Sequence, residues 1–420
     1  MKTQANQTTF TGYLTFWSGQ LVSVLGSSIA SFVIIWWITL ETESALYLSI
    51  ASFAGFAPMV ILMPFAGVLV DRWSRKALIG IVDLLQALAT VALIFLFWLN
   101  MISIWSVLAL LALRGIFQAF HNPAVSAIVP LMVPREKLSR MNGLNYLLSG
   151  AVTLMGPVIA ALLLEFWKIG QILWIDAATF IVALVPLLII KIPSVRKKQD
   201  KDPARSSFKK DFGEGLTFIK DARGLLPFIV LATALNFLLT PLSTLLPYYV
   251  RFDHFGGAPD LALVMALFQG GILAGGLLMS VMKGFKRKMV AITFSVYGIF
   301  LGYAVVALTP TGLFWFMAIG GLIMACCVPI ANVSIQTIIQ TVVPMKMQGR
   351  INSVIGALAS AASPFGMILS GVIVGFTRTS NVYLVCAGLG ILTLTLSWFF
   401  TDMRHVEEIE ENVKKGITEK

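Results

Sequence analysis

The stretch GVLVDRWSRKALI, from Gly67 to Ile79, places one aspartate and three cations between two long apolar segments. A soluble protein would carry roughly 25% charged residues and about half apolar ones. This chain of 420 residues has 12% charged and 58% hydrophobic residues, with a mean hydropathy of +0.87. The composition therefore predicts a membrane protein, in which the charged stretch is a short connection between two membrane-spanning helices.

Apolar segments long enough to cross a hydrocarbon core of about 30 Å as a helix recur along the whole chain. A polar stretch from Lys191 to Gly224 separates the first six from the last six. We therefore expect an all-α membrane protein of twelve transmembrane helices in two six-helix bundles, residues 1–191 and 225–401, with a cytoplasmic linker at 192–224 and a cytoplasmic tail at 402–420. The expected spans are residues 12–40, 46–70, 77–99, 104–129, 141–165, 171–191, 225–250, 261–282, 289–308, 313–341, 350–377 and 381–401.

The linker contains apolar residues at helical spacing, namely Phe208, Phe212, Leu216 and Ile219. This pattern predicts a short amphipathic helix. Such a helix can lie on the cytoplasmic membrane surface or pack beneath a bundle, and the sequence leaves both options open.

The positive charges lie mostly on one side of the predicted helices. Of the 31 Lys and Arg residues, all except Arg114, Lys168, Arg251 and Arg378 fall in the N-terminal segment, the even-to-odd helix connections, the linker or the tail. The positive-inside rule assigns that side to the cytoplasm. We therefore expect a multi-pass protein of the cell membrane with both termini cytoplasmic, and the net charge of +11 does not indicate nucleic-acid binding.

The two halves resemble each other at an offset of 210 residues. The stretch NPAVSAIVPLMVPREKLSRMNGL from Asn122 aligns with NVSIQTIIQTVVPMKMQGRINSV from Asn332, so that Asn122, Pro134, Arg140, Asn142 and Gly156 lie opposite Asn332, Pro344, Arg350, Asn352 and Gly366. Two parallel repeats of six helices predict two related bundles that face each other across a central cavity.

The opening stretch is similar to the signature that transporters of the major facilitator superfamily carry between their second and third helices. The matching residues are Gly67, Asp71, Arg72, Arg75 and Lys76, and a weaker second copy, GLLMSVMKGFKRK, runs from Gly276 to Lys288. The resemblance implies that this cluster is a gate, which latches the two halves on the cytoplasmic side when the cavity opens outward. The bland alternative is an orientation signal with weak surface ion pairs.

Within that superfamily the chain looks like the drug-efflux branch that includes macrolide exporters and the related enterobactin exporter. The stretches that carry this likeness are FWSGQLVSVLGSSI, FHNPAVSAIVPLMVPREKL, DAATF and EGLTFI. The fifth expected span, residues 141–165, partly matches the proline-glycine motif of antiporters through Gly143, Gly156 and Pro157. Where that motif has glycines, this span has Val152, Ala160 and Ala161. The resemblance implies proton antiport.

Charged residues inside membrane helices cost about 2.5–3.5 kcal/mol each on insertion scales, so each one indicates a function. Asp83, Arg114 and Asp176 are the clear cases, all in the first half. Counting depth at about 1.5 Å per residue predicts that Asp83 and His121 can pair. Proton coupling is the function we expect of these four residues, while Asp83 could instead reach back to Arg75 or Lys76, Asp176 could cap the outer surface, and His121 could make only a structural hydrogen bond.

In this architecture the first, fourth, seventh and tenth membrane-spanning helices line the centre. In this chain the middle parts of those four expected spans are mostly apolar. The candidate substrate-binding residues are Arg114, Phe117, Gln118, Asn236, Phe237, Gln269 and Asn332. This lining favours export of amphiphilic small molecules such as drugs, with siderophores, lipids or other metabolites as the alternative cargo.

Other functional classes have little support in the sequence. No constellation of nucleophile, metal ligands or paired acid and base is evident, so we expect no enzyme activity, cofactor or metal; Cys326, Cys327 and Cys386 lack metal-ligand spacing. A membrane sensor without transport activity would need a sizeable ligand domain. The expected partners are the amphiphilic substrate, protons and the lipid bilayer, and we expect a monomer.

Overall fold

The computed structural model describes residues 7–190, 192, 213, 216–220, 224–282, 284–285, 287–343 and 348–405, and every regular element in these ranges is helical. In chain order the main helices are α1 (Gln7–Thr42), α2 (Ala45–Arg72), α3 (Arg75–Trp98), α4 (Ile104–Ser126), α5 (Val129–Met132), α6 (Leu138–Leu164), α7 (Ile169–Ile189), α9 (Leu225–Tyr248), α10 (Ala258–Val281), α11 (Lys288–Ala307), α12 (Phe314–Val342), α13 (Gln348–Ala361), α14 (Ser363–Val374) and α15 (Thr379–Phe400). Short helical turns cover Arg135–Lys137, Tyr249–Asp253 and Asp402–His405.

Twelve spans in the described part of the chain are long and apolar enough to cross a membrane, as the sequence predicts. Two of these spans begin directly after a serine that caps the N-terminus of the helix. Ser74 caps α3 by accepting a hydrogen bond from the Ala77 amide, and Ser103 forms a reciprocal capping box with Ser106 at the start of α4. The charged connection after α2 is therefore also a helix start signal.

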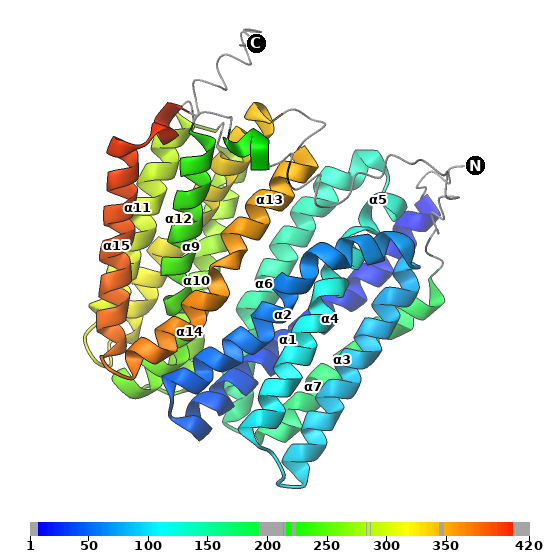
Figure 1. The fold of residues 1–420 in the computed structure, drawn as a ribbon. Coiled ribbons are helices and arrows are strands. Elements are labelled where there is room, and N and C mark those ends of the chain that lie inside the picture. The colour runs from blue at the N-terminus through cyan, green and yellow to red at the C-terminus, as the bar shows by residue number, and fades with distance from the viewer. Residues whose placement is uncertain are drawn as a thin grey trace. The chain divides into compact units, whose positions relative to one another are not determined.

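The chain divides into two compact units, which Figure 1 colours from blue to green and from green to red. The first comprises Met1–Lys198 with the short pieces Val250–Phe252 and Gly256–Ala266. In it α1 packs against α6 and α7, α2 against α4, and α3 against α4 and α7. A core cluster at one end of this unit includes Tyr13, Phe16, Ile79 and Met132.

The second unit comprises Gln199–Tyr249, Asp253–Phe255 and Leu267–Lys420. Here α11 packs against α12 and α15, while α9 packs against α13, α14 and α15. Three tyrosines, Tyr249, Tyr303 and Tyr383, are almost fully buried here. The centre of the Tyr383 ring lies 5.0 Å from that of Tyr249 and 5.4 Å from that of Tyr303. The Tyr249 hydroxyl donates to the carbonyls of Val306 and Ala307 at 3.2 Å, which ties α9 to the end of α11.

The offset of 210 recurs in the helix boundaries. Helix α7 at Ile169–Ile189 corresponds to α15 at Thr379–Phe400, and α6 at Leu138–Leu164 corresponds to the pair α13 and α14, from Gln348 to Val374. The packing repeats as well. A Cβ at Gly156 of α6 would overlap Ser28 of α1, and a Cβ at Gly366 of α14 would press on Phe237 and Thr240 of α9. The two units are therefore built on one helix arrangement.

One detail differs from the expected spans, and another bears on the linker. The eleventh segment, expected at 350–377 as one helix, is divided at Ala362 into α13 and α14, because Pro364 lies in the first turn of α14 and has no amide hydrogen to continue the ladder. In the linker, Ile219 is fully buried against residues of α9, α12 and α13, so residues 216–220 fit the alternative of packing beneath a bundle. Phe208 and Phe212 lie outside the described residues.

Candidate functional site

The carboxyl group of Asp176 is the centre of a buried polar network in the first unit. The side chain has no exposed surface, and both of its oxygens accept hydrogen bonds. Ser27 of α1 donates to Oδ1 at 2.8 Å, while Thr90 of α3 and Arg114 of α4 donate to Oδ2 at 2.8 and 3.0 Å. Four helices thus each contribute one polar group, and a carboxylate at this point has three donors, one of which is a cation.

Small residues let the helices approach closely enough to form this network. A Cβ at Gly26 would overlap the Thr179 hydroxyl and press on the Asp176 backbone, so α1 and α7 are in contact beside Ser27. A Cβ at Gly115 would overlap the Gly55 carbonyl oxygen, which brings α2 against α4 next to Arg114. The side chain of Arg114 keeps 13% of its surface exposed, whereas Asp176 keeps none, so Arg114 is the member of the pair that solvent or a ligand can reach.

A second buried carboxyl group lies on the same helix as Thr90. Asp83 of α3 is 2% exposed, and its Oδ1 lies 3.0 Å from Nε2 of His121 on α4. Its other oxygen accepts a hydrogen bond from Gln20 of α1 at 3.3 Å. The structure thus brings Asp83 and His121 together, and the residue that Asp83 meets on α1 is an amide rather than a cation of the loop.

The sequence reasoning missed three members of these networks and one pairing. Gln20, Ser27 and Thr90 are not among the predicted site residues. The sequence predicts proton coupling for Asp176, or a cap near the outer surface, but not its pairing with Arg114. Depth contains the missing signal: Asp176 and Arg114 lie about 10 and 15 Å from the starts of α7 and α4, at about 1.5 Å per residue, and these two helices start at the same end of the unit. Gln118 lies one turn beyond Arg114 but donates to Asn122 instead.

The structure describes only some of the side chains in the opening stretch, Gly67 to Ile79. Helix α2 ends at Arg72, and the side chains of Gly67, Asp71 and Arg72 lie outside those that the structure describes. Lys76 donates from Nζ to the carbonyls of Leu188 and Ile190, at 2.8 and 2.7 Å. It therefore neutralises the negative end of the α7 dipole within the first unit.

Of the other proposed substrate-binding residues, Phe117 belongs to the first unit, whereas Asn236, Phe237, Gln269 and Asn332 belong to the second. Phe117 is half-buried beside the core cluster of the first unit. Phe237 of α9 packs against Gly366 of α14, and Asn236 is exposed and bonds its amide to the Ala232 carbonyl of its own helix. Gln269 is half-buried and Asn332 is exposed.

The residues of the antiporter motif fall on α6. Gly156 and Pro157 are buried, and Gly156 provides the close contact with α1 already described. A Cβ at Gly143 would meet no atom within 4 Å, so Gly143 is not required for helix packing. No group of three or more His, Cys, Asp and Glu side chains suited to a metal ion occurs among the residues that the structure describes.

Comparison with known proteins agrees with this architecture. A model of the major facilitator superfamily matches residues 16–307 and 252–419. The chain belongs to the major facilitator superfamily. The protein is 30% identical to macrolide efflux protein A of Streptococcus pyogenes over 397 residues, which is 94% of this chain and 97% of that protein.

Two further proteins are also similar to this chain. The multidrug efflux pump Tap of Mycolicibacterium fortuitum is 26% identical over 361 residues, covering 84% of this chain and 86% of that one. The crystal structure of the nucleoside transporter NupG superposes with a TM-score of 0.71 at 14% identity, covering 92% of this chain and 98% of that chain, and shows the fold alone. This superfamily member is thus a multi-pass membrane transporter in architecture.

Proposed function

We propose that this protein exports amphiphilic small molecules, of macrolide or related drug type, from the cell in exchange for protons by alternating access. Its relatives of 26–30% identity are a macrolide efflux protein and a multidrug efflux pump, which supports the cargo class. The observation that carries the coupling mechanism is the contact of 3.0 Å between Arg114 and the fully buried Asp176. A buried, ionisable pair inside a membrane protein costs free energy of insertion, so its presence indicates a function.

In the proposed cycle, proton binding and substrate binding shift the same conformational equilibrium in opposite directions. Protonation of Asp176 removes the negative charge that holds Arg114, since the neutral acid attracts a guanidinium much less strongly. Ser27 and Thr90 keep the carboxyl group in place, so the change is confined to the Arg114 side. Arg114, which is partly exposed, is then free to meet a ligand or to shift α4 against α7. The Asp83–His121 pair is a second place where a proton can bind.

Everted membrane vesicles test the coupling directly. Addition of a macrolide to vesicles that hold a proton gradient should release protons, and the Asp176→Asn variant should abolish this release while its amount in the membrane stays unchanged. Glu165→Gln is the matched control, because Glu165 is an exposed carboxyl group of the same unit. If Asp83→Asn and Asp176→Asn together left gradient-driven drug accumulation unchanged, the coupling group would have to be elsewhere.

We propose that the gate is the connection between α2 and α3, through Asp71, Arg72, Arg75 and Lys76, and that both termini are on the cytoplasmic side of the cell membrane. The excess of Lys and Arg at one set of connections supports this orientation. The monomer is the proposed transporting unit. Cysteine labelling from outside intact cells tests the orientation: a cysteine at Lys168 should react, and one at Lys137 should not.

Export of a siderophore or another anionic amphiphile is the alternative that one observation favours. Arg114 has exposed surface in the interior of a mostly apolar bundle, and a guanidinium recognises carboxylate and phosphate groups well. Competition assays with neutral and anionic amphiphiles in the same vesicles separate the two cargo classes.

A further inference from the structure

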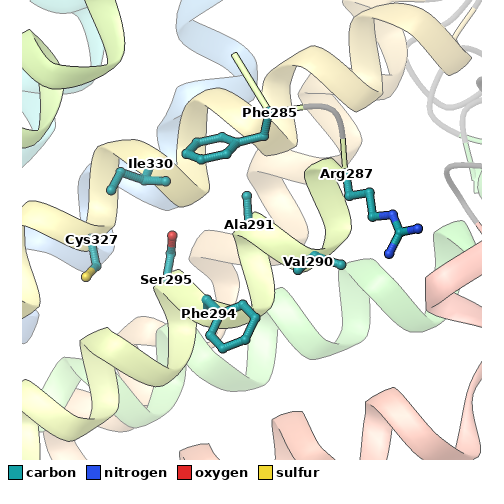
Figure 2. A pocket seen from close by; sticks show the side chains of 8 residues that line it. All are labelled: Phe285, Arg287, Val290, Ala291, Phe294, Ser295, Cys327 and Ile330. Carbon is teal, nitrogen blue, oxygen red and sulfur yellow. The ribbon is translucent and has the colours of Figure 1, made fainter. Parts of the chain in front are cut away.

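A crevice in the second unit combines an apolar lining with a cation at its edge. It has a volume of about 650 Å³, and its lining comes from the connection after α10, from the first two turns of α11 and from α12. The residues are Phe285, Arg287, Val290, Ala291, Phe294, Ser295, Cys327 and Ile330. In Figure 2 the Phe285 ring extends toward Ile330, and the guanidinium of Arg287 lies at the periphery and points away from the other side chains.

The crevice lies where α11 meets α12, and its lining includes exposed residues of α11. Its α11 residues are Val290, Ala291, Phe294 and the buried Ser295, and Arg287 directly precedes the helix. Ile292, Val296 and Ile299 are buried on the other side of α11, whereas Cys327 and Ile330 of α12 line the crevice together with α11. Phe294 is 72% exposed. In a membrane-spanning helix, an exposed apolar face that is turned from the bundle is in contact with lipid.

The charge at the edge indicates which lipid fits. Arg287 is exposed, directly precedes α11, and has no ion pair among the described residues. The sequence KGFKRK from Lys283 to Lys288 carries four cations, on the side that the charge bias assigns to the cytoplasm. Anionic phospholipids face that side, and basic pockets between membrane helices bind their head groups. A volume of about 650 Å³ lies within the range of about 300–1,000 Å³ that accommodates a drug-sized ligand, and so can admit part of an acyl chain.

We propose that this crevice is a binding site for one anionic phospholipid of the surrounding leaflet. The phosphate group lies against Arg287, and an acyl chain occupies the space over Ala291 between Phe285 and Phe294. The start of α11 favours the same charge, since the amide end of a helix attracts anions. This proposal does not depend on the transported substrate or on proton coupling.

Photo-crosslinking in reconstituted vesicles tests the site. The probes are phosphatidylglycerol and phosphatidylcholine with the same photoactivatable acyl chain, and peptide mass spectrometry locates the label. Phosphatidylglycerol should label residues 287–295 more strongly than phosphatidylcholine does. Arg287→Gln should reduce the phosphatidylglycerol label about fivefold, the effect expected for one basic residue near an anionic lipid. Ala291→Trp should abolish the label from both lipids by filling the crevice.

Matched controls use the same kinds of substitution elsewhere. Leu301→Trp lies on the same exposed face of α11 two turns beyond the crevice, and Arg378→Gln removes an exposed cation before α15. Neither should change the label at residues 287–295. Equal labelling by the two lipids, or full labelling of a well-folded Ala291→Trp variant, would overturn the proposal. So would displacement of the phosphatidylglycerol label by an added macrolide, which would make the crevice a drug entry site.

Discussion

Replacement of Arg114 by methionine should be far more harmful alone than together with Asp176→Leu. Asp176 is fully buried and accepts three hydrogen bonds, of which only that from Arg114 carries positive charge. Arg114→Met leaves the carboxylate buried without a cation, and breaking a buried pair in this way costs about 3–5 kcal/mol. Asp176→Leu leaves the guanidinium without its carboxylate and should cost a similar amount, reduced by the 13% of its surface that stays exposed.

The double variant replaces the pair by two apolar side chains, which is often close to neutral for stability. Ser27 and Thr90 lose an acceptor, but a hydroxyl in a helix can bond to a carbonyl of the preceding turn. We therefore expect the double variant to lie within about 2 kcal/mol of the natural protein. The two single costs would exceed the double cost by at least about 3 kcal/mol, which is a large interaction energy for a double-mutant cycle.

The assay is unfolding of the purified protein in mixed micelles at increasing SDS, followed by tryptophan fluorescence. Glu165→Leu with Arg378→Met is the matched control cycle, because both residues are exposed and they belong to different units. Its effects should add. A double Arg114→Met, Asp176→Leu variant that is as unstable as the sum of its parts would refute the reasoning, because the two groups would then not stabilise each other. Both singles and the double should fail to couple drug export to protons.

Three further changes test other parts of the chain. Asp71→Asn should stop drug export in cells without lowering the amount of protein in the membrane; normal export would remove the gating assignment. Gly115→Val should force α2 and α4 apart at the Gly55 carbonyl and cost about 1–3 kcal/mol, measured as a lower thermal midpoint, whereas Gly143→Ala, with no atom near its Cβ, should not. Burial lowers the pKa of the His254 imidazole, so the unfolded chain binds the proton more readily than the folded one. Stability should therefore fall as the pH drops through about 6.5. His254→Leu should reduce the loss in thermal midpoint between pH 7.5 and 5.5, and an unchanged loss would contradict this.

The membrane spans could be predicted from sequence because they depend on length and hydropathy alone, and the offset repeat placed the halves in correspondence. Contacts inside the bundle were harder. The Asp83–His121 pair followed from depth in adjacent helices, whereas the Arg114–Asp176 pair depends on which faces of α4 and α7 meet, and that is set by close packing at Gly26 and Gly115. Spacing in the sequence does not report such packing when a helix is apolar all round.

The buried tyrosines of the second unit were also not predicted. Tyr249, Tyr303 and Tyr383 are counted as hydrophobic in composition, and tyrosine in a membrane protein is commonly assigned to the interface. In the structure they are 0–1% exposed and tie α9, α11 and α15 together. Their role is visible only after the helices are packed, because Tyr249 and Tyr383 donate to backbone carbonyls, which every residue has, and the Tyr303 hydroxyl is buried with no hydrogen-bond partner among the described residues.

At the equivalent positions of the second unit, the described residues do not repeat the ionisable network. At the offset of 210, Asp176 corresponds to Cys386 on α15, and Arg114 corresponds to Met324 on α12; both counterparts are buried. The positions that hold a carboxylate and a guanidinium in the first unit therefore hold a thiol and a thioether in the second. A charge in a membrane helix costs about 2.5–3.5 kcal/mol, so a second copy is expected only if a second function needs it. Under the proposed mechanism one unit binds the proton, while the other is free to offer apolar surface to an amphiphilic cargo. Cys386→Asp with Met324→Arg tests this division: we expect the variant to fold less well and to gain no additional proton per drug molecule, since Ser27 and Thr90 have Phe237 and Phe300 as their counterparts and the donors that hold the carboxylate are missing.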